Sequence, residues 1–172
     1  DRIAFLTPRK GELYKLSYGR VLEYVKRLGR YLKELGLGKG DHIAILGENR
    51  PEWAIAYFAV TWIGAIAIPL DARASSAFYK HVLNFSTAKA IILPSSYIPH
   101  IHQIQDEVNA LKHIILMENL EDIYRKYEKG TDKEIVLSDE LAEILFTSGT
   151  TGTPRGVMLT HRNIMSNVED IY

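Results

Sequence analysis

The residues with the clearest chemistry lie at positions 144–156 of this 172-residue chain, in the sequence ILFTSGTTGTPRG. Its glycines can adopt backbone conformations that other residues avoid, so that backbone N–H groups can turn toward an anion. The guanidinium of Arg155 adds a planar set of donors suited to phosphate oxygens, and Pro154 restricts the backbone beside it. Further donors are the hydroxyl groups of Thr147, Ser148, Thr150, Thr151 and Thr153. We therefore predict a loop that cradles a polyphosphate.

A stretch rich in glycine, serine and threonine can also be an ordinary surface turn. The flanking apolar segments, residues 141–146 and 157–159, favour the binding loop because they are predicted strands that would fix both of its ends. The stretch is too long for a tight hairpin turn. It is not a Walker A loop, because neither Gly149 nor Gly152 has Gly-Lys at the required offset, and it lacks the Gly-x-Gly-x-x-Gly pattern of dinucleotide-binding proteins.

The rest of the chain must position this loop, and its apolar pattern predicts alternating strands and helices. Strands are expected at residues 3–6, 42–46, 65–70, 90–93 and 113–117. Helices are expected between the N-cap Ser17 and the stop signal Gly36, at residues 51–63, 75–85, 99–111 and 120–128, and after the N-cap Thr160. Several strands are continuous apolar runs, which suits a parallel sheet covered on both faces. The predicted fold class is α/β, with a doubly wound, mostly parallel sheet and helices on both faces.

A second candidate site, formed by His100 and His102, is rejected. On a strand these two side chains would share a face and could bind a metal ion. The segment begins with Pro99 and is predicted to be helical, where residues two apart diverge, and no third ligand is evident nearby in the sequence.

Composition limits the classes of partner. The chain has 21 acidic and 21 basic residues, which gives no reason to expect a nucleic acid or an anionic membrane as partner. It contains no cysteine, so disulfides and thiolate metal sites are excluded. No apolar run approaches the roughly 20 residues that span a bilayer, so we expect no transmembrane segment and a soluble, cytoplasmic protein.

The ends of the chain suggest a portion of a larger protein. It begins at Asp1 without methionine, and Tyr172 falls inside a predicted helix. If the sheet and core of a parent protein continue past Tyr172, this portion should expose an apolar face or a strand edge, and such surfaces tend to be covered by another chain. A homodimer, with exchanged segments as one form, is therefore a hypothesis.

Residues 146–163, FTSGTTGTPRGVMLTHRN, resemble the phosphate-loop signature of the adenylate-forming (AMP-binding) superfamily, the acyl-CoA synthetases and their relatives. Arg155 stands where that family usually has lysine, and a guanidinium contacts phosphate differently from an ammonium. Three earlier segments also resemble the family's amino-terminal region, in the same order: residues 40–46, 48–53 and 64–71. The sequence ENRPEW at 48–53 is most similar to the long-chain fatty acid branch. By this resemblance residues 1–172 are the amino-terminal part of the adenylation domain, with a seam near residues 130–134.

The resemblance implies a reaction. Enzymes of this family let a carboxylate attack the α-phosphorus of MgATP, which gives an acyl adenylate and pyrophosphate, and coenzyme A then takes the acyl group. The residues implied to hold the β- and γ-phosphates are Thr147, Ser148, Gly149, Thr150, Thr151 and Gly152. Arg155 would replace the usual lysine, and Thr147 would lie near the magnesium ion. The implied cofactors of the parent protein are ATP, Mg²⁺ and coenzyme A, with a carboxylic acid, expected to be a fatty acid, as substrate.

No catalytic residue is expected within these 172 residues. In the family, the adenine and ribose contacts, a metal-binding glutamate, the acyl pocket and a catalytic lysine come from sequence after the loop, so we expect this portion alone to be inactive. Two alternatives stay open. One is a non-catalytic nucleotide-binding module, and the other is an adenylation enzyme that passes the acyl group to a carrier protein.

Overall fold

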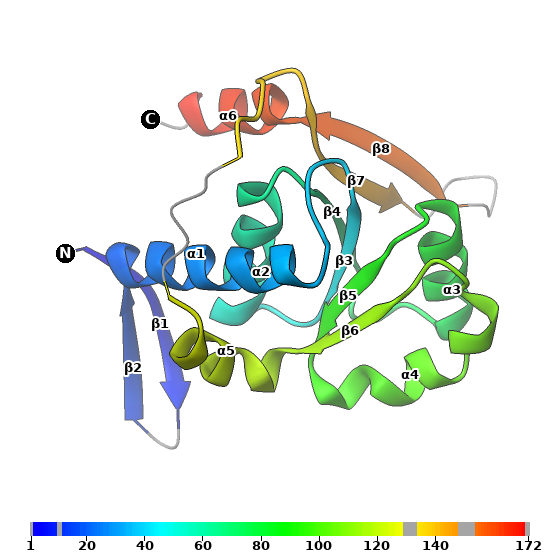
Figure 1. Ribbon diagram of the computed structural model, residues 1–172, viewed down its shortest axis with the longest axis horizontal. Coiled ribbons are helices and arrows are strands. Elements are labelled where there is room, and N and C mark those ends of the chain that lie inside the picture. The colour runs from blue at the N-terminus through cyan, green and yellow to red at the C-terminus, as the bar shows by residue number, and fades with distance from the viewer. Residues whose placement is uncertain (1, 10–11, 129–133, 148–153, 171–172) are drawn as a thin grey trace.

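The computed structural model describes residues 2–9, 12–128, 134–147 and 154–170. Within these residues, six strands form the main sheet in the order β6-β5-β3-β4-β7-β8 (Figure 1). Their bounds are β3 His42–Leu46, β4 Ile66–Leu70, β5 Ala90–Leu93, β6 His113–Leu116, β7 Leu141–Thr147 and β8 Arg155–Thr160. Each neighbouring pair is parallel except β7 and β8, which are antiparallel. The predicted α/β, mostly parallel sheet is confirmed, with an antiparallel strand at one edge.

Helices cover both faces of this sheet (Figure 1). One buried cluster joins alternate β3 residues, Ile43 and Ile45, to α1, α2 and α5, and the other joins Ala44 and Leu46 to α3 and α4. The helix bounds are α1 Tyr18–Glu34, α2 Pro51–Trp62, α3 Ser76–Phe85, α4 Ile98–His102 and α5 Leu120–Lys126. Because successive residues of a strand point to opposite faces, a strand buried on both faces must be apolar throughout, as β3 is.

Local signals in the sequence fix where several helices begin. The side chain of Ser17 accepts a hydrogen bond from the Arg20 backbone N–H at 3.3 Å, and Ser75 does the same for Phe78. Pro51 occupies the first turn of α2. Thr160 and Asn163 form a capping box for α6 (His161–Glu169). The predicted starts of these four helices are confirmed.

Two parts of the chain differ from the prediction. Residues 3–6 were predicted as a lone strand, but they belong to β1 (Ile3–Arg9), which pairs antiparallel with β2 (Glu12–Ser17) in a separate small sheet. The continuous helix predicted at 99–111 is wrong: α4 ends at His102 and a 3₁₀ turn, Gln105–Glu107, follows. The Asn84 side chain of α3 donates to the Glu107 carbonyl at 2.9 Å, so tertiary contact replaces a helical hydrogen bond there.

The rejected metal site and the membrane prediction can be compared with the fold. His100 is helical, and its Nδ1 lies 3.0 Å from the Ser76 hydroxyl. The described residues contain no group of three or more His, Cys, Asp or Glu side chains that could hold a metal ion. None of the described helices combines the length and apolar character that crossing a bilayer requires. The seam predicted near residues 130–134 lies almost entirely outside the described residues.

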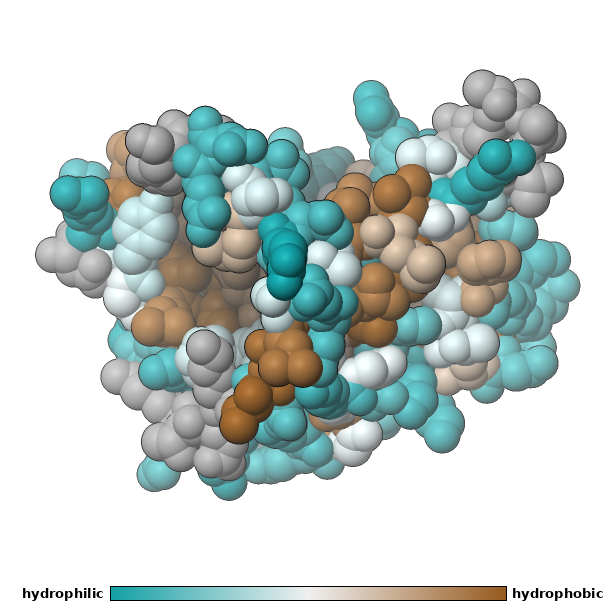
Figure 2. Space-filling model, turned by 90° about the horizontal axis from the view of Figure 1, so that it is seen from above, coloured by the Kyte–Doolittle hydropathy of each residue, from teal (hydrophilic) through white to brown (hydrophobic). Residues whose placement is uncertain are grey.

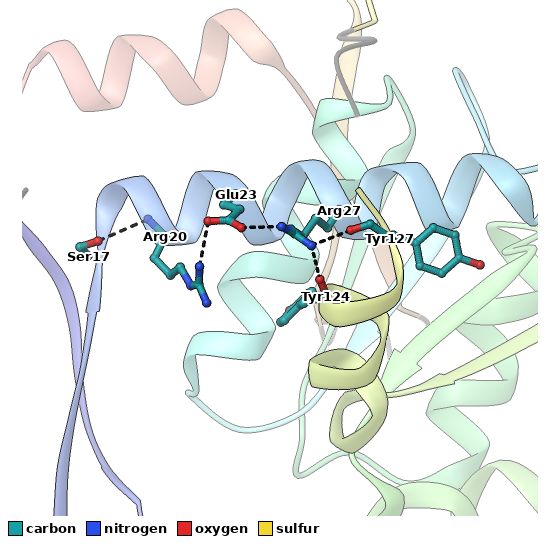
Figure 3. A network of polar contacts seen from close by, with 6 residues as sticks. All are labelled: Ser17, Arg20, Glu23, Arg27, Tyr124 and Tyr127. Carbon is teal, nitrogen blue, oxygen red and sulfur yellow. Dashed lines mark hydrogen bonds and ion pairs between the residues drawn. The ribbon is translucent and has the colours of Figure 1, made fainter. Parts of the chain in front are cut away.

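Helix α1 is tied to α5 by one arginine (Figure 3). The Arg27 guanidinium donates to the backbone carbonyls of Tyr124 and Tyr127, at 2.5 and 2.8 Å, and to the Glu23 carboxylate at 2.7 Å. The rings of Tyr24 and Tyr124 stack beside it with centroids 4.0 Å apart. These carbonyls end α5 and have no partner within the helix, so Arg27 satisfies them and offsets the negative end of its dipole.

Replacing Arg27 with methionine should lower the free energy of unfolding by about 1.5–3 kcal/mol, because part-buried carbonyls lose a charged donor. The matched control is Arg30→Met one turn further along α1, where an exposed pair with Glu34 at 3.4 Å is lost. That change should cost less than about 0.5 kcal/mol. Urea denaturation of both variants measures the difference, and equal losses would contradict the assigned role of Arg27.

Candidate functional site

The two ends of the predicted phosphate loop meet in the structure. Strands β7 and β8 form a hairpin in which Thr147 pairs with Arg155. Residues directly opposite each other in an antiparallel pair project from the same face, so the Thr147 and Arg155 side chains leave the hairpin on the same side. Both residues are exposed. Among the described residues, Arg155 has no ion-pair partner, which leaves its donors available to an anion.

The remaining predicted site residues cannot be located. Ser148, Gly149, Thr150, Thr151 and Gly152 lie outside the described residues. The structure therefore brings together Thr147 and Arg155, the residues at the base of the loop, and the contacts predicted for the other five stay a prediction.

The loop base lies at the carboxyl edge of the parallel sheet. Ala67 of β4 is in register with Glu143 of β7, so Thr147 is level with Asp71, the residue after β4. Strand β4 follows β3 on one side of the sheet, whereas β5 pairs with β3 on its other side. Ligands of open α/β sheets bind at this edge, at the point where the strand order reverses. The fold thus puts the predicted loop where its chemistry is expected.

A crevice of about 520 Å³ opens at the same edge, between the ends of β3 and β4. Its lining includes Gly47, Glu48 and Asn49 after β3 and Asp71 and Arg73 after β4. A Cβ atom at Gly47, where φ is +153°, would lie 3.1 Å from the Pro94 ring, so glycine allows the close approach of these two segments. The crevice has the size of a small-molecule site.

Asp71 holds a fixed negative charge in this crevice. The Arg73 backbone N–H donates to its carboxylate at 2.9 Å, and this bond together with the nearby guanidinium lowers the pKa of Asp71. The Tyr79 hydroxyl donates to the Asp71 carbonyl at 3.0 Å, and burial raises the pKa of Tyr79 to about 12, so it stays a neutral donor. Asp71 and Arg73 were not predicted as site residues. A charged residue directly after a continuous apolar strand was the signal that could have indicated them.

The face of β7 that carries Thr147 also contacts α2 through a polar pair. Tyr57 of α2 lies near the Glu143 carboxylate, and burial first, then the Glu143 charge, raise the pKa of Tyr57. The Trp53 ring stacks on Tyr57 with centroids 5.7 Å apart. This pair of a neutral tyrosine and a half-buried carboxylate thus connects β7 to α2.

A second, larger cavity of about 700 Å³ lies away from the loop, between α1, α2, α6 and residues 134–138. Figure 2, which looks down on the molecule from above, shows it as an apolar hollow. Phe58, Trp62 and Met165 are among its lining residues. Exposed apolar side chains on β8 and α6 include Met158, at 64 % exposure, and Met165, at 52 %. The expected exposed apolar surface is therefore present, whereas the homodimer stays a hypothesis.

Three comparisons bear on this arrangement. The AMP-binding enzyme family matches residues 1–172. The chain is 32 % identical over 160 residues to a long-chain-fatty-acid–CoA ligase of Thermus thermophilus, which covers 90 % of this chain and 30 % of that protein. It is 32 % identical over 168 residues to a crotonobetaine/carnitine–CoA ligase of Salmonella arizonae, over 90 % of this chain and 32 % of that one. The chain thus spans about a third of the length of these curated relatives.

A solved structure shares the fold. ATP-bound MatB from Rhodopseudomonas palustris superposes with a TM-score of 0.80 at 26 % sequence identity. The match covers 90 % of this chain and 31 % of that one. The fold described above is therefore common to this chain and about a third of a much longer protein.

Adding a side chain at Gly156 should destabilise the hairpin. A Cβ atom there would lie 2.8 Å from Ile144 Cγ2, closer than Cβ atoms approach in real structures, and 3.3 Å from Phe146 Cζ, which is a tight contact. We expect Gly156→Ala to lower the free energy of unfolding by about 1–3 kcal/mol through overpacking. Gly38→Ala is the control, since nothing lies within 4 Å of its added Cβ. Thermal denaturation of both variants checks this, and equal stability would mean that Ile144 can move aside at no cost.

Proposed function

Because the chain belongs to the AMP-binding enzyme family, we propose that the protein is an AMP-forming acid–CoA ligase whose ATP phosphates bind at the β7–β8 loop. The observation that supports this most directly is the pairing of Thr147 with Arg155 at the carboxyl edge of the sheet. A residue with a hydroxyl donor and one with a guanidinium, which has no ion-pair partner among the described residues, lie opposite each other there at the base of a glycine-rich loop. The ATP-bound relative of the same fold agrees with a nucleotide site.

The proposed role of this region is to stabilise the negative charge that develops on the leaving pyrophosphate. A carboxylate oxygen attacks the α-phosphorus, the bond from that phosphorus to the bridging oxygen breaks, and pyrophosphate leaves with the added negative charge. Donors fixed in advance around the leaving group lower the barrier because they need no rearrangement as the charge develops. Thr147, Ser148, Gly149, Thr150, Thr151 and Gly152 would bind the β- and γ-phosphates. Arg155 would contact them through a guanidinium in place of the family's usual lysine, and its planar fork favours two parallel hydrogen bonds.

The residues of this site would bind Mg²⁺ only together with the phosphates of the nucleotide. Mg²⁺ prefers oxygen ligands and usually keeps waters and substrate phosphates in its coordination shell. The described part of the chain has no cluster of three or more candidate metal ligands, so Thr147, with its exposed hydroxyl, is the protein contact proposed for it. The ion would offset phosphate charge, while the loop would hold the phosphates in place.

We propose a fatty acid as the substrate. The sequence at residues 48–53 and the similarity to the fatty-acid ligase of Thermus thermophilus support it. The equally similar relative from Salmonella arizonae bears the name of a ligase for a different acid, so a graded series of carboxylic acids must be assayed with the full-length protein. Two alternatives remain: the acyl group passes to a carrier protein in place of coenzyme A, or the protein binds a nucleotide without catalysis. The products formed in the same assay distinguish them.

Arg155 variants of the full-length protein test the phosphate site. Arg155→Ala should reduce kcat/KM for acid-dependent exchange of pyrophosphate into ATP by about 100- to 1000-fold, because a donor to the leaving group is lost. Arg155→Lys should recover most of the activity. The control is Arg125→Ala, which removes an exposed arginine of α5 at 78 % side-chain exposure. Activity that is equal in Arg155→Ala and in the control would count against the proposed site.

The 172-residue chain by itself should form no acyl adenylate, because it spans only 30–32 % of its ligase relatives. The measurement is release of labelled pyrophosphate from ATP with fatty acid, under conditions in which the full-length protein turns over. Turnover by this chain would show that the required groups all lie within it.

A further inference from the structure

On its β4 side, the end of β7 that carries the loop lies beyond the pairing that the described residues show. In the part of the chain that the structure describes, the ladder between β4 and β7 joins Ala67 to Glu143. Phe146 and Thr147 lie beyond this pair, toward the carboxyl end. On the other side β7 pairs with β8, which is the edge strand of the sheet. A contact from outside the sheet would restrain this end of β7 further.

Helix α3 supplies such a contact at its last residue. The Phe85 ring meets the Phe146 ring edge to face, with centroids 5.8 Å apart and an interplanar angle of 84°. One turn earlier, His81 stacks on the other side of Phe85, with centroids 6.0 Å apart. Phe85 is 68 % exposed. An exposed phenylalanine that buries little surface contributes mainly through the neighbours it orients, here the residue directly before Thr147.

Strand β8, opposite β7 in the hairpin, leaves space for the Phe146 ring. Phe146 pairs across the hairpin with Gly156, next to Arg155. Because Gly156 has no side chain, Phe146 lies close over β8, and any Cβ there would meet both Ile144 and Phe146. One aromatic ring thus contacts α3 on one side and the backbone of β8 on the other. Its neighbours in sequence and in register are Thr147 and Arg155, the two described site residues.

We propose that Phe85 is a positioning residue, which fixes the base of the phosphate loop through Phe146. Phe85 touches neither nucleotide nor acid in this arrangement. It restricts the rotation of the β7–β8 end relative to α3, so that the Thr147 hydroxyl and the Arg155 guanidinium keep their spacing. The effect on ATP rests on the function proposed above, whereas the effect on the loop base does not.

Hydrogen exchange tests the positioning itself in the full-length protein without substrate. Phe85→Ala should speed exchange of the amides in residues 144–147 and 155–158 by about threefold to tenfold, the range expected for one aromatic pair. Phe85→Tyr keeps the ring edge and should exchange as the natural protein does. The matched control is Leu13→Ala, which truncates a similarly exposed apolar side chain, at 60 % exposure, on β2 of the separate small sheet. It should leave these two segments unchanged.

Kinetics then separate this inference from the proposed function. Phe85→Ala should raise KM for ATP about threefold to tenfold and leave KM for the acid unchanged, and Phe85→Tyr should restore the KM for ATP. Faster exchange with an unchanged KM for ATP, in a protein where Arg155→Ala is also fully active, would retain the positioning role and reject the phosphate site. Unchanged exchange in Phe85→Ala would overturn the inference. So would an equal change in Leu13→Ala, or a uniform rise across the whole sheet.

Discussion

A parallel sheet brings the carboxyl ends of its strands to one edge, and this constraint decides where the chemistry of the chain can lie. Strands β3, β4 and β7 run in the same direction, so Gly47, Asp71 and Thr147 meet at that edge although they are far apart in sequence. The antiparallel return of β8 then brings Arg155 back beside Thr147. A different direction for any one of these strands would separate the loop from the crevice.

The central strands of the sheet are covered by helices on both faces, whereas the edge that carries the proposed site is more exposed. Residues of β3, β4 and β5 are buried on both faces, by α1 and α2 on one and by α3 and α4 on the other. At β8, in contrast, Val157 and Met158 are exposed, at 47 % and 64 %. Segments that bind ligands are commonly drawn from the less stable end of a fold, because they must adjust to the ligand. The few contacts that restrain the hairpin, such as Tyr57 with Glu143 and Phe85 with Phe146, therefore matter more than their area suggests.

The comparisons and the geometry address different parts of the function. The two curated relatives are CoA ligases whose names specify different acids, yet both match this chain to the same extent. Such a pattern agrees with a region that handles the nucleotide common to the family and leaves the choice of acid to other parts of the protein. By the resemblance of residues 146–163, Arg155 stands where the family usually has lysine, and under the function proposed above its planar fork would bind phosphate with a different geometry from a point charge.

The sequence by itself determined the elements whose signals are local. Serine and threonine caps set the starts of α1, α3 and α6, and the apolar runs of β3 and β5 gave these strands with the bounds that the structure has. The resemblance of residues 146–163 indicated the family and the candidate loop. The caps, the strands and the family assignment are confirmed, because caps, periodicity and motifs depend on residues a few positions apart, whereas the candidate loop stays a prediction.

Only the tertiary structure decided which of these elements are neighbours. The antiparallel edge, the pairing of Thr147 with Arg155, the Asp71 crevice and the break after α4 each depend on contacts between distant segments. The sequence pattern of β7 is the same whether its partner runs parallel or antiparallel. Side-chain periodicity specifies which face of a strand is buried, whereas direction and order in the sheet follow from how the connecting helices pack.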